Sequence, residues 1–300
     1  PLRMMRAAYF ASKLGFEIEK KCRASIKRQA HRIDIVSWER IRDEFIKILK
    51  TKKPSVGLVI LQKTSLMETV FPEIHVMYGM EQTSEWHHND IFAHTLQVVD
   101  NAAELSDKME IRFAALVHDI AKPNTRRIDD NKGYTFHGHD AVGERMLNKV
   151  AHRLKLPNTL KEYLKKLTLL HLRPIALVKE IVTDSAVRRL MLAAGEDLDD
   201  LMILCRADIT TKNPNRVKQY LKNFNKVEEK MSNVNERDAM KAFQSPVRGA
   251  EIMEICGLTE GRKVGEIKEA IEEAILDGKI DNSYDAAKDY LLEIKDGILQ

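Results

Sequence analysis

The sequence predicts an all-α protein, an elongated array of helices with at most one short β-hairpin near residues 126–136. Strong helix formers such as Leu, Ala, Glu and Lys are abundant, whereas the 300 residues include only 13 Gly, 8 Pro and 6% aromatic residues. Apolar residues recur three and four positions apart in most segments, which is the period of an α-helix. Turn-forming residues separate these segments, as at Asn213-Pro214-Asn215.

The first 80 residues predict four helices. Ser37 is a good N-cap for the third, in which Ile41, Phe45 and Ile48 form an apolar stripe, and Pro54 stops it. We expect helices over residues 2–14, 19–31, 37–53 and 56–66, followed by a bend at 71–73.

Residues 82–211 predict a helical domain, interrupted by a loop or hairpin at 126–134. A long, highly charged helix follows over 216–242. Ser245-Pro246 is a good N-cap and first-turn pair for the next helix. A glycine-containing connection at 257–265 leads to two closing helices, over 266–276 and 284–299.

The net charge of +4 is unevenly distributed. Residues 1–54 carry 15 Lys/Arg and 6 Asp/Glu, a net charge of +9, whereas residues 231–300 carry 9 Lys/Arg and 15 Asp/Glu, a net charge of −6. A basic amino-terminal segment indicates contact with a phosphate backbone, and a solvated helix face is the alternative explanation. The candidate RNA-binding residues lie in the second helix: Lys20, Lys21, Arg23, Lys27 and Arg28.

The remaining composition limits the class of protein. Three scattered cysteines are too few for a disulfide framework, and no apolar run approaches the length of a transmembrane helix. We therefore expect a soluble cytoplasmic protein without membrane contact. Because the chain begins at Pro1, without Met and inside a predicted helix, we also expect it to be part of a longer protein.

Side chains that can bind metal lie on separate apolar segments of the chain. They are His94, the adjacent pair His118-Asp119, and Asp208. Each lies three or four residues from an apolar neighbour of its own helix, so each faces the interior. A buried His-Asp pair costs several kcal/mol unless it is paired or metal-bound. Imidazole and carboxylate ligands without thiolates suit Mg, Mn, Fe, Co, Ni or Zn.

A second cluster of ligands is predicted around His139 and His171. His139 extends the apolar stripe of the helix that follows it, whereas His137 does not. His139 and His171 are therefore candidates for a second metal or for a phosphate site. Asp119, with two carboxylate oxygens, is placed to bridge two ions in phosphoester hydrolysis. Lys122, one turn after His118, is placed to hold a substrate phosphate.

The string His118-Asp119-Ile120-Ala121-Lys122, spaced from His94 and Asp208, resembles the HD phosphohydrolase superfamily. The segment 1–18 resembles the stretch that follows the catalytic head in bacterial tRNA nucleotidyltransferases of the CCA-adding and poly(A) polymerase family. Further segments match this family in the same order: Ser37–Glu44 of its neck motif, Phe71–Glu73, Phe136–Asp140 and Val264–Ile267.

This resemblance implies three parts: a neck of nucleotide- and RNA-binding helices at 1–80, an HD domain at 81–212, and a tRNA-binding helical tail at 213–300. It implies that Arg3, the arginine of a Glu-Asp-x-x-Arg motif, and Arg40 bind CTP or ATP in the parent enzyme. The family's Gly-Gly…Asp-x-Asp polymerase site is not found in this sequence. There is no Gly-Gly, and Asp197-Leu198-Asp199 lacks the preceding glycine turn.

Three interpretations remain open from the sequence. The chain supplies tRNA binding and part of the nucleotide pocket to an enzyme that adds or repairs the CCA end. Alternatively, its HD domain is itself a metal-dependent phosphohydrolase that acts on 2′-nucleotides, 2′,3′-cyclic phosphates or simple phosphoesters, with Asp119 and Lys122 as catalytic residues. In the third interpretation the chain is a binding module whose HD site is structural or vacant.

Overall fold

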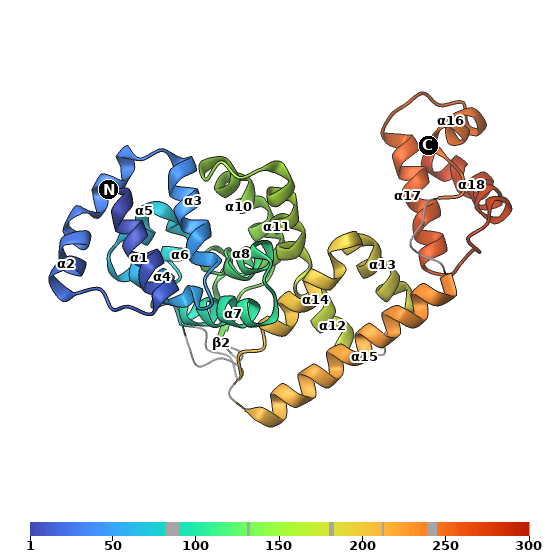
Figure 1. Ribbon diagram of the computed structural model, residues 1–300. Coiled ribbons are helices and arrows are strands. Elements are labelled where there is room, and N and C mark those ends of the chain that lie inside the picture. The colour runs from blue at the N-terminus through green and yellow to red at the C-terminus, as the bar shows by residue number, and fades with distance from the viewer. Residues whose placement is uncertain (82–89, 131–132, 180–182, 212, 239–244, 300) are drawn as a thin grey trace. The chain divides into compact units, whose positions relative to one another are not determined.

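The computed structural model describes residues 1–299 except 82–89, 131–132, 180–182, 212 and 239–244. The chain forms two compact units. One comprises Pro1–Val178 and Ala194–Asn225, and the other comprises Lys179–Ala193 and Lys226–Gln300. Among the described residues the only paired strands are β1, Arg127–Asp129, and β2, Gly133–Thr135, which form an antiparallel hairpin (Figure 1). The predicted all-α class with one short hairpin is confirmed.

Seven short helices form the amino-terminal part of the first unit. They are α1 Leu2–Leu14, α2 Lys20–Gln29, the 3₁₀ helix η1 Ala30–Ile35, α3 Trp38–Leu49, α4 Pro54–Lys63, α5 Leu66–Val70 and α6 Pro72–His75. Helix α4 comes close to α1 and α3 at Gly57. A Cβ atom on Gly57 would lie 2.5 Å from Ile48 Cγ2 and 3.3 Å from Ser12 Cβ, so only glycine fits there without a shift.

Among the described residues, the rest of the first unit contains eight helices, among them α8. Their bounds are α7 Ile91–Leu105, α8 Met109–Val117, α9 Lys122–Thr125, α10 His139–Arg153, α11 Asn158–Leu170, α12 Arg173–Lys179, the 3₁₀ helix η2 Gly195–Asp197 and α14 Leu198–Ala207. Helices α3, α7, α11 and α14 all contact α8. As a result every residue from Ile111 to Val117 is buried, which explains why this segment is almost entirely apolar.

Arg112 is the one charged residue in the buried part of α8. It is 4% exposed, and its guanidinium donates to the carbonyls of Leu49 and Thr51 at 3.1 and 3.0 Å. It also donates to the Ser106 carbonyl at 3.0 and 3.1 Å. These carbonyls lie at or just beyond the carboxyl ends of α3 and α7, where helices have unsatisfied acceptors and negative dipole ends.

Replacing Arg112 by Met is expected to lower the free energy of unfolding by about 3 kcal/mol or more, because several buried carbonyls lose a charged donor at once. Chemical denaturation followed by circular dichroism measures this change. The matched control is Arg145→Met, since Arg145 is exposed on α10. Equal stability of the two variants would contradict the structural role of Arg112.

The second unit has its own apolar core. Its helices are α13 Asp184–Ala194, α16 Gly249–Cys256, α17 Arg262–Leu276 and α18 Tyr284–Leu299, and α15, Pro214–Asp238, continues into it from the first unit. The fully buried core residues include Val247, Ile252, Ile267, Ile271 and Leu291. An ion pair between Arg189 and Asp277 joins α13 to the end of α17.

Several predicted helix boundaries are wrong. Helix α16 begins at Gly249 and not at Pro246. The Ser245 hydroxyl donates to the Val247 carbonyl, and the capping carboxylate is Glu251, which accepts from the Arg248 amide. Helix α17 begins at Arg262, four residues before the predicted start. Helix α4 begins at Pro54, whose missing amide proton is harmless in a first turn.

Within the described ranges we find no helix with the length and apolar character needed to span a lipid bilayer.

Candidate metal centre and basic surface

The four predicted metal ligands lie together in the first unit, although three helices supply them. His94 is on α7, His118 and Asp119 follow α8, and Asp208 follows α14. His94 Nε2 lies 3.0 Å from Asp208 Oδ1, and His118 Nε2 lies 3.1 Å from Asp119 Oδ2. His94, His118 and Asp119 are at most 3% exposed. Their polar atoms therefore converge in a space that is almost closed to solvent.

His139 and His171 lie on the other side of Asp119. His139 Nε2 is 3.3 Å and His171 Nε2 is 3.9 Å from Asp119 Oδ1. Asp119 thus directs Oδ2 toward His94 and His118 and Oδ1 toward His139 and His171. The structure therefore contains two groups of ligand atoms, each within 4.8 Å of one another: His94, His118 and Asp208, and Asp119, His139 and His171.

The four imidazole rings are oriented by hydrogen bonds to their other nitrogen. His118 Nδ1 donates to the Ala115 carbonyl at 2.8 Å, and His139 Nδ1 donates to the Phe136 carbonyl at 2.7 Å. His171 Nδ1 donates to the Thr168 carbonyl at 2.6 Å, and His94 Nδ1 lies 3.1 Å from the Thr210 hydroxyl. The carbonyl partners place a proton on Nδ1 of His118, His139 and His171, so each of these Nε2 atoms can present its lone pair to a metal, as histidine ligands commonly do.

The residues fit a bound cation. In the described part of the chain, His118 Nε2 and Asp208 Oδ1 are buried atoms without a hydrogen-bond partner of normal geometry. Buried polar atoms are rarely left without partners, because each costs about 1–3 kcal/mol. A divalent cation bound between them would remove this cost. Nitrogen and oxygen ligands of this kind suit Mg, Mn, Fe, Co, Ni or Zn.

The electrostatics of the site also favour a positive charge at its centre. Burial opposes charge on Asp119, yet His118 and the Lys122 ammonium, 2.6 Å away, hold the Asp119 pKa well below its usual range. Burial likewise opposes protonation of His118, but Asp119 and Asp208 raise its pKa to about 10. Burial lowers the pKa of His171 to about 4, so His171 is neutral at physiological pH. Without a metal, the proton on His118 balances part of the negative charge.

Metal binding is therefore expected to release a proton and to strengthen as pH rises. The ion must displace the His118 proton, so affinity should increase about tenfold per pH unit between pH 7 and 9. The stability of the metal-free protein depends on pH in the opposite direction. A raised His118 pKa contributes stability that is complete below pH 6.5 and is lost as pH rises to about 10. Titration calorimetry of Mn²⁺ in buffers of different ionisation enthalpy measures the proton release, and an affinity independent of pH would contradict it.

Lys122 is the predicted phosphate-holding residue. Its ammonium pairs with Asp119 Oδ2 and lies 5.6 Å from the centre of the Phe136 ring. It therefore lies at the edge of the ligand cluster. The sequence did not identify Thr210, Phe136 or Thr168 as partners of the histidines. Only the short spacing of Phe136–His139 and Thr168–His171, three residues each, is a local signal for these contacts.

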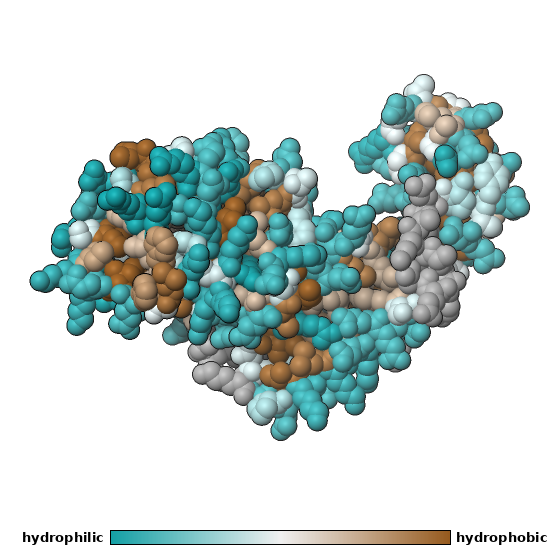
Figure 2. All heavy atoms as spheres, viewed as in Figure 1, coloured by the Kyte–Doolittle hydropathy of each residue, from teal (hydrophilic) through white to brown (hydrophobic). Residues whose placement is uncertain are grey.

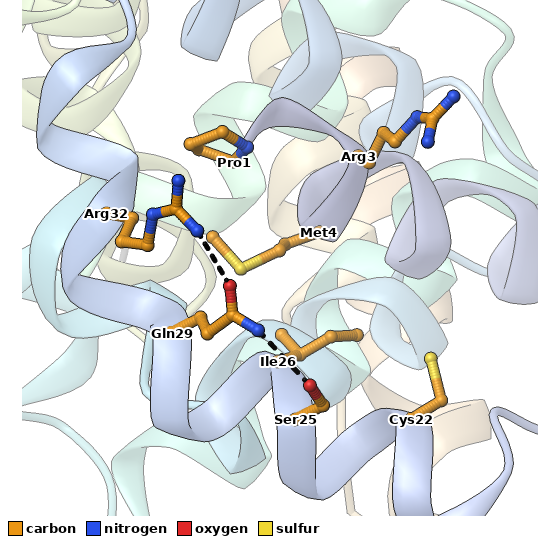
Figure 3. Close-up of a pocket in the computed structure, with 8 residues that line it drawn as sticks. All are labelled: Pro1, Arg3, Met4, Cys22, Ser25, Ile26, Gln29 and Arg32. Atoms are coloured by element: carbon orange, nitrogen blue, oxygen red, sulfur yellow. Dashed lines mark hydrogen bonds between the residues drawn. The ribbon is translucent and has the colours of Figure 1, made fainter.

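Arg3 lines a cavity of about 220 Å³ formed by α1, α2 and η1 (Figure 3). The floor is apolar, with Met4 and Ile26, and the Arg32 guanidinium donates to the Gln29 side chain at 3.0 Å. Arg40, the other predicted nucleotide-binding residue, is exposed on α3 and is not among the residues that line this cavity. Arg3 and Arg32 line the same cavity from different helices, but the Arg3 guanidinium points away from Arg32 (Figure 3). The sequence did not identify Arg32.

The predicted RNA-binding residues of α2 form a basic surface. Ile26 is the one buried residue of this helix, and Figure 2 shows hydrophilic side chains along its outer edge. The five predicted residues are Lys20, Lys21, Arg23, Lys27 and Arg28. All five side chains are exposed, and in the described part of the chain none of them forms an ion pair with an acidic side chain. Their charge is therefore free to attract an anionic partner.

Two family models match the chain. Residues 15–78 match a probable RNA- and SrmB-binding site of polymerase A, and residues 91–213 match the HD domain. An HD domain implies a divalent metal, which agrees with the two groups of ligands.

Curated relatives and a solved structure resemble nearly the whole chain. The A-adding tRNA nucleotidyltransferase of Deinococcus radiodurans is 30% identical over 95% of this chain and 66% of its own length. The CC-adding tRNA nucleotidyltransferase of Thermus thermophilus is 29% identical over 99% of this chain and 67% of its own length. The chain thus spans about two thirds of the length of these relatives.

The fold resembles the Bacillus stearothermophilus CCA-adding enzyme, which was crystallised in complex with CTP. The TM-score is 0.63 at 20% identity, over 97% of this chain and 61% of the other. The matched RNA-binding and HD models, the relatives and the arrangement of helices agree. This chain belongs to the bacterial tRNA nucleotidyltransferase family and carries an HD domain.

Proposed function

We propose that this chain supplies the tRNA-binding region and the HD-type metal site of an enzyme that adds or repairs the 3′-terminal CCA of tRNA. In this proposal tRNA is the partner, CTP and ATP are substrates of the whole protein, and the protein works in the cytoplasm. The parts are a neck at 1–80, an HD domain at 81–212 and a helical tail at 213–300. The named relatives add A in one case and CC in the other, so the added nucleotides are part of what must be measured.

The exposed basic surface of α2 carries this proposal. It lies within the segment that matches the RNA-binding family model, and its cations have no acidic partner in the described part of the chain. Exposed Lys and Arg side chains position a nucleic acid through its phosphates, and folded RNA is recognised mainly by shape and backbone.

The cavity at Arg3 supports a nucleotide role. Arg3 and Arg32 both line a cavity that has apolar lining from Met4 and Ile26, and arginine beside an apolar surface suits a base together with an anionic group. The CCA-adding enzyme of similar fold was crystallised with CTP. We propose Arg3 as a nucleotide-binding residue on these grounds, and Arg40 only on the resemblance of its segment to the neck motif.

Titration of fluorescently labelled tRNA with the purified chain over a range of salt concentrations tests the tRNA-binding role. We expect an affinity that falls steeply as salt rises, because each phosphate contact releases a counterion. A DNA duplex of similar length is the control for purely electrostatic attraction. An absence of tRNA binding at low salt, or equal affinity for the duplex, would contradict the proposal.

A second function is favoured by the buried ligand cluster: a metal-dependent phosphohydrolase acting on 2′-nucleotides, 2′,3′-cyclic phosphates or simple phosphoesters. The two Asp119 oxygens face two groups of candidate ligands, so this carboxylate would serve both groups if each held an ion. Bound divalent ions would supply an activated water and charge stabilisation. Lys122, at the edge of the cluster, would hold the substrate phosphate and neutralise charge that develops on its oxygens.

This second function is tested by assaying cyclic nucleotides, 2′-nucleotides and a chromogenic phosphoester with Mg²⁺, Mn²⁺, Co²⁺ and Ni²⁺. We expect hydrolysis of at least one class that depends on the added metal and disappears with a chelator. The Lys122→Ala variant should bind the metal but hydrolyse more slowly, with the larger effect on kcat/KM. If the protein binds metal tightly but hydrolyses none of these substrates, the phosphohydrolase function is wrong and the metal site is structural.

A further inference from the structure

His139 and His171 are held on two adjacent helices that approach each other closely. His139 begins α10 and His171 follows α11, and their Nε2 atoms are 3.3 Å apart. Each ring is tied through Nδ1 to a carbonyl three residues before it. Neither ring can therefore turn independently of its backbone, and the distance between the two Nε2 atoms is fixed by the packing of α10 against α11.

Gly143 permits this packing. It lies one helical turn after His139, and a Cβ atom there would be 2.9 Å from Thr168 Cγ2 and 3.3 Å from Ile120 Cγ2. Both neighbours are next to candidate ligands. Thr168 gives its carbonyl to His171 Nδ1, and Ile120 directly follows Asp119. The backbone of α10 thus lies directly against the two segments that carry the other ligands of this group.

We infer that Gly143 is the positioning residue of the second ion site, formed by Asp119, His139 and His171. Two carbons prefer a separation of about 3.5 Å or more, so a methyl group at this position would move α10 by about 0.6 Å away from Thr168. His139 would move with its helix. His94, His118 and Asp208, which come from α7, α8 and α14, would keep their positions. This inference rests on the proposed two-ion centre.

The experiment counts Mn²⁺ ions on the full chain and records the electron paramagnetic resonance signal of a coupled ion pair. We expect two ions and a coupled signal in the wild type. In Gly143→Ala we expect the second ion to bind at least tenfold more weakly and the coupled signal to be lost, with the first ion unchanged. The double variant Gly143→Ala/Thr168→Ser should recover both, because serine lacks the Cγ2 atom but keeps the hydroxyl and the carbonyl.

Gly57→Ala is the matched control. It creates an even closer contact, 2.5 Å from Ile48 Cγ2, but in the amino-terminal helices away from the ligands. It should lower the melting temperature and leave both ions in place. If Gly143→Ala binds two ions with wild-type affinity, loses both equally, or is not rescued by Thr168→Ser, the positioning role is wrong. If the wild type binds only one Mn²⁺ ion and His139→Ala binds it with the same affinity, the proposed two-ion centre is wrong.

Discussion

Replacing Asp119 by Ala is expected to weaken binding of both divalent ions by at least about 100-fold and to abolish any metal-dependent hydrolysis. Asp119 is the only side chain whose oxygens contact both groups of ligands in the described structure. Its loss also removes the carboxylate that Lys122 contacts at 2.6 Å, so the positive charge of Lys122 would repel an incoming cation. Titration with Mn²⁺ and the phosphoester assay together measure the effect.

Asp119→Asn is the second variant, since it keeps the shape of the side chain and one carbonyl oxygen while removing the charge. It should fold and should still bind metal far more weakly than the wild type. The control is Asp199→Ala, because Asp199 is an exposed carboxylate in the first turn of α14. Equal metal binding in Asp119→Asn and the wild type would exclude Asp119 as a ligand. A loss of hydrolysis in Asp199→Ala would show that the segment Asp197-Leu198-Asp199 contributes to the hydrolytic activity.

Removing all five cations of α2 is expected to reduce tRNA affinity by at least about 100-fold near 0.1 M salt. The variant changes Lys20, Lys21, Arg23, Lys27 and Arg28 to Ala. The slope of log affinity against log salt should fall by about 0.7–0.9 for each phosphate contact removed. Since these side chains are exposed and Ala favours helices, the fold should be retained.

A smaller pair of variants separates local contact from net charge. Lys27→Ala/Arg28→Ala removes two charges from α2, and Arg145→Ala/Lys149→Ala removes two exposed charges from α10. Only the first pair should flatten the salt dependence of tRNA binding. If both pairs weaken binding equally, α2 contributes general positive charge and no specific surface.

The helices were predictable because their signals are local. The apolar stripe of α3, with Ile41, Phe45 and Ile48, is buried as expected from its spacing. Boundaries were less predictable because capping depends on geometry. Ser245-Pro246 looks like a helix start, but the Ser245 hydroxyl donates to a nearby carbonyl and Glu251 caps the helix that begins at Gly249. The domain limits and the roles of the site residues stay predictions.

The sequence by itself determined the helical class and the inward-facing residues, because residue type and a period of 3.6 are properties of neighbouring positions. The family was indicated by the resemblance of several motifs, in order, to those of known proteins. It also identified His139 rather than His137, and His139 is the buried one of the two. It did not identify Arg32 as a lining residue of the same cavity as Arg3, because this depends on how α1 packs against α2 and η1.

Only the tertiary structure decided how the ligands are divided. His94 and Asp208 are more than 100 positions apart in the chain, and helix packing brings their atoms to 3.0 Å. The same packing directs the two oxygens of Asp119 toward different histidine pairs. Because Gly143 sets the approach of α10 to α11, a position without any side chain is expected to determine whether the protein holds a second ion.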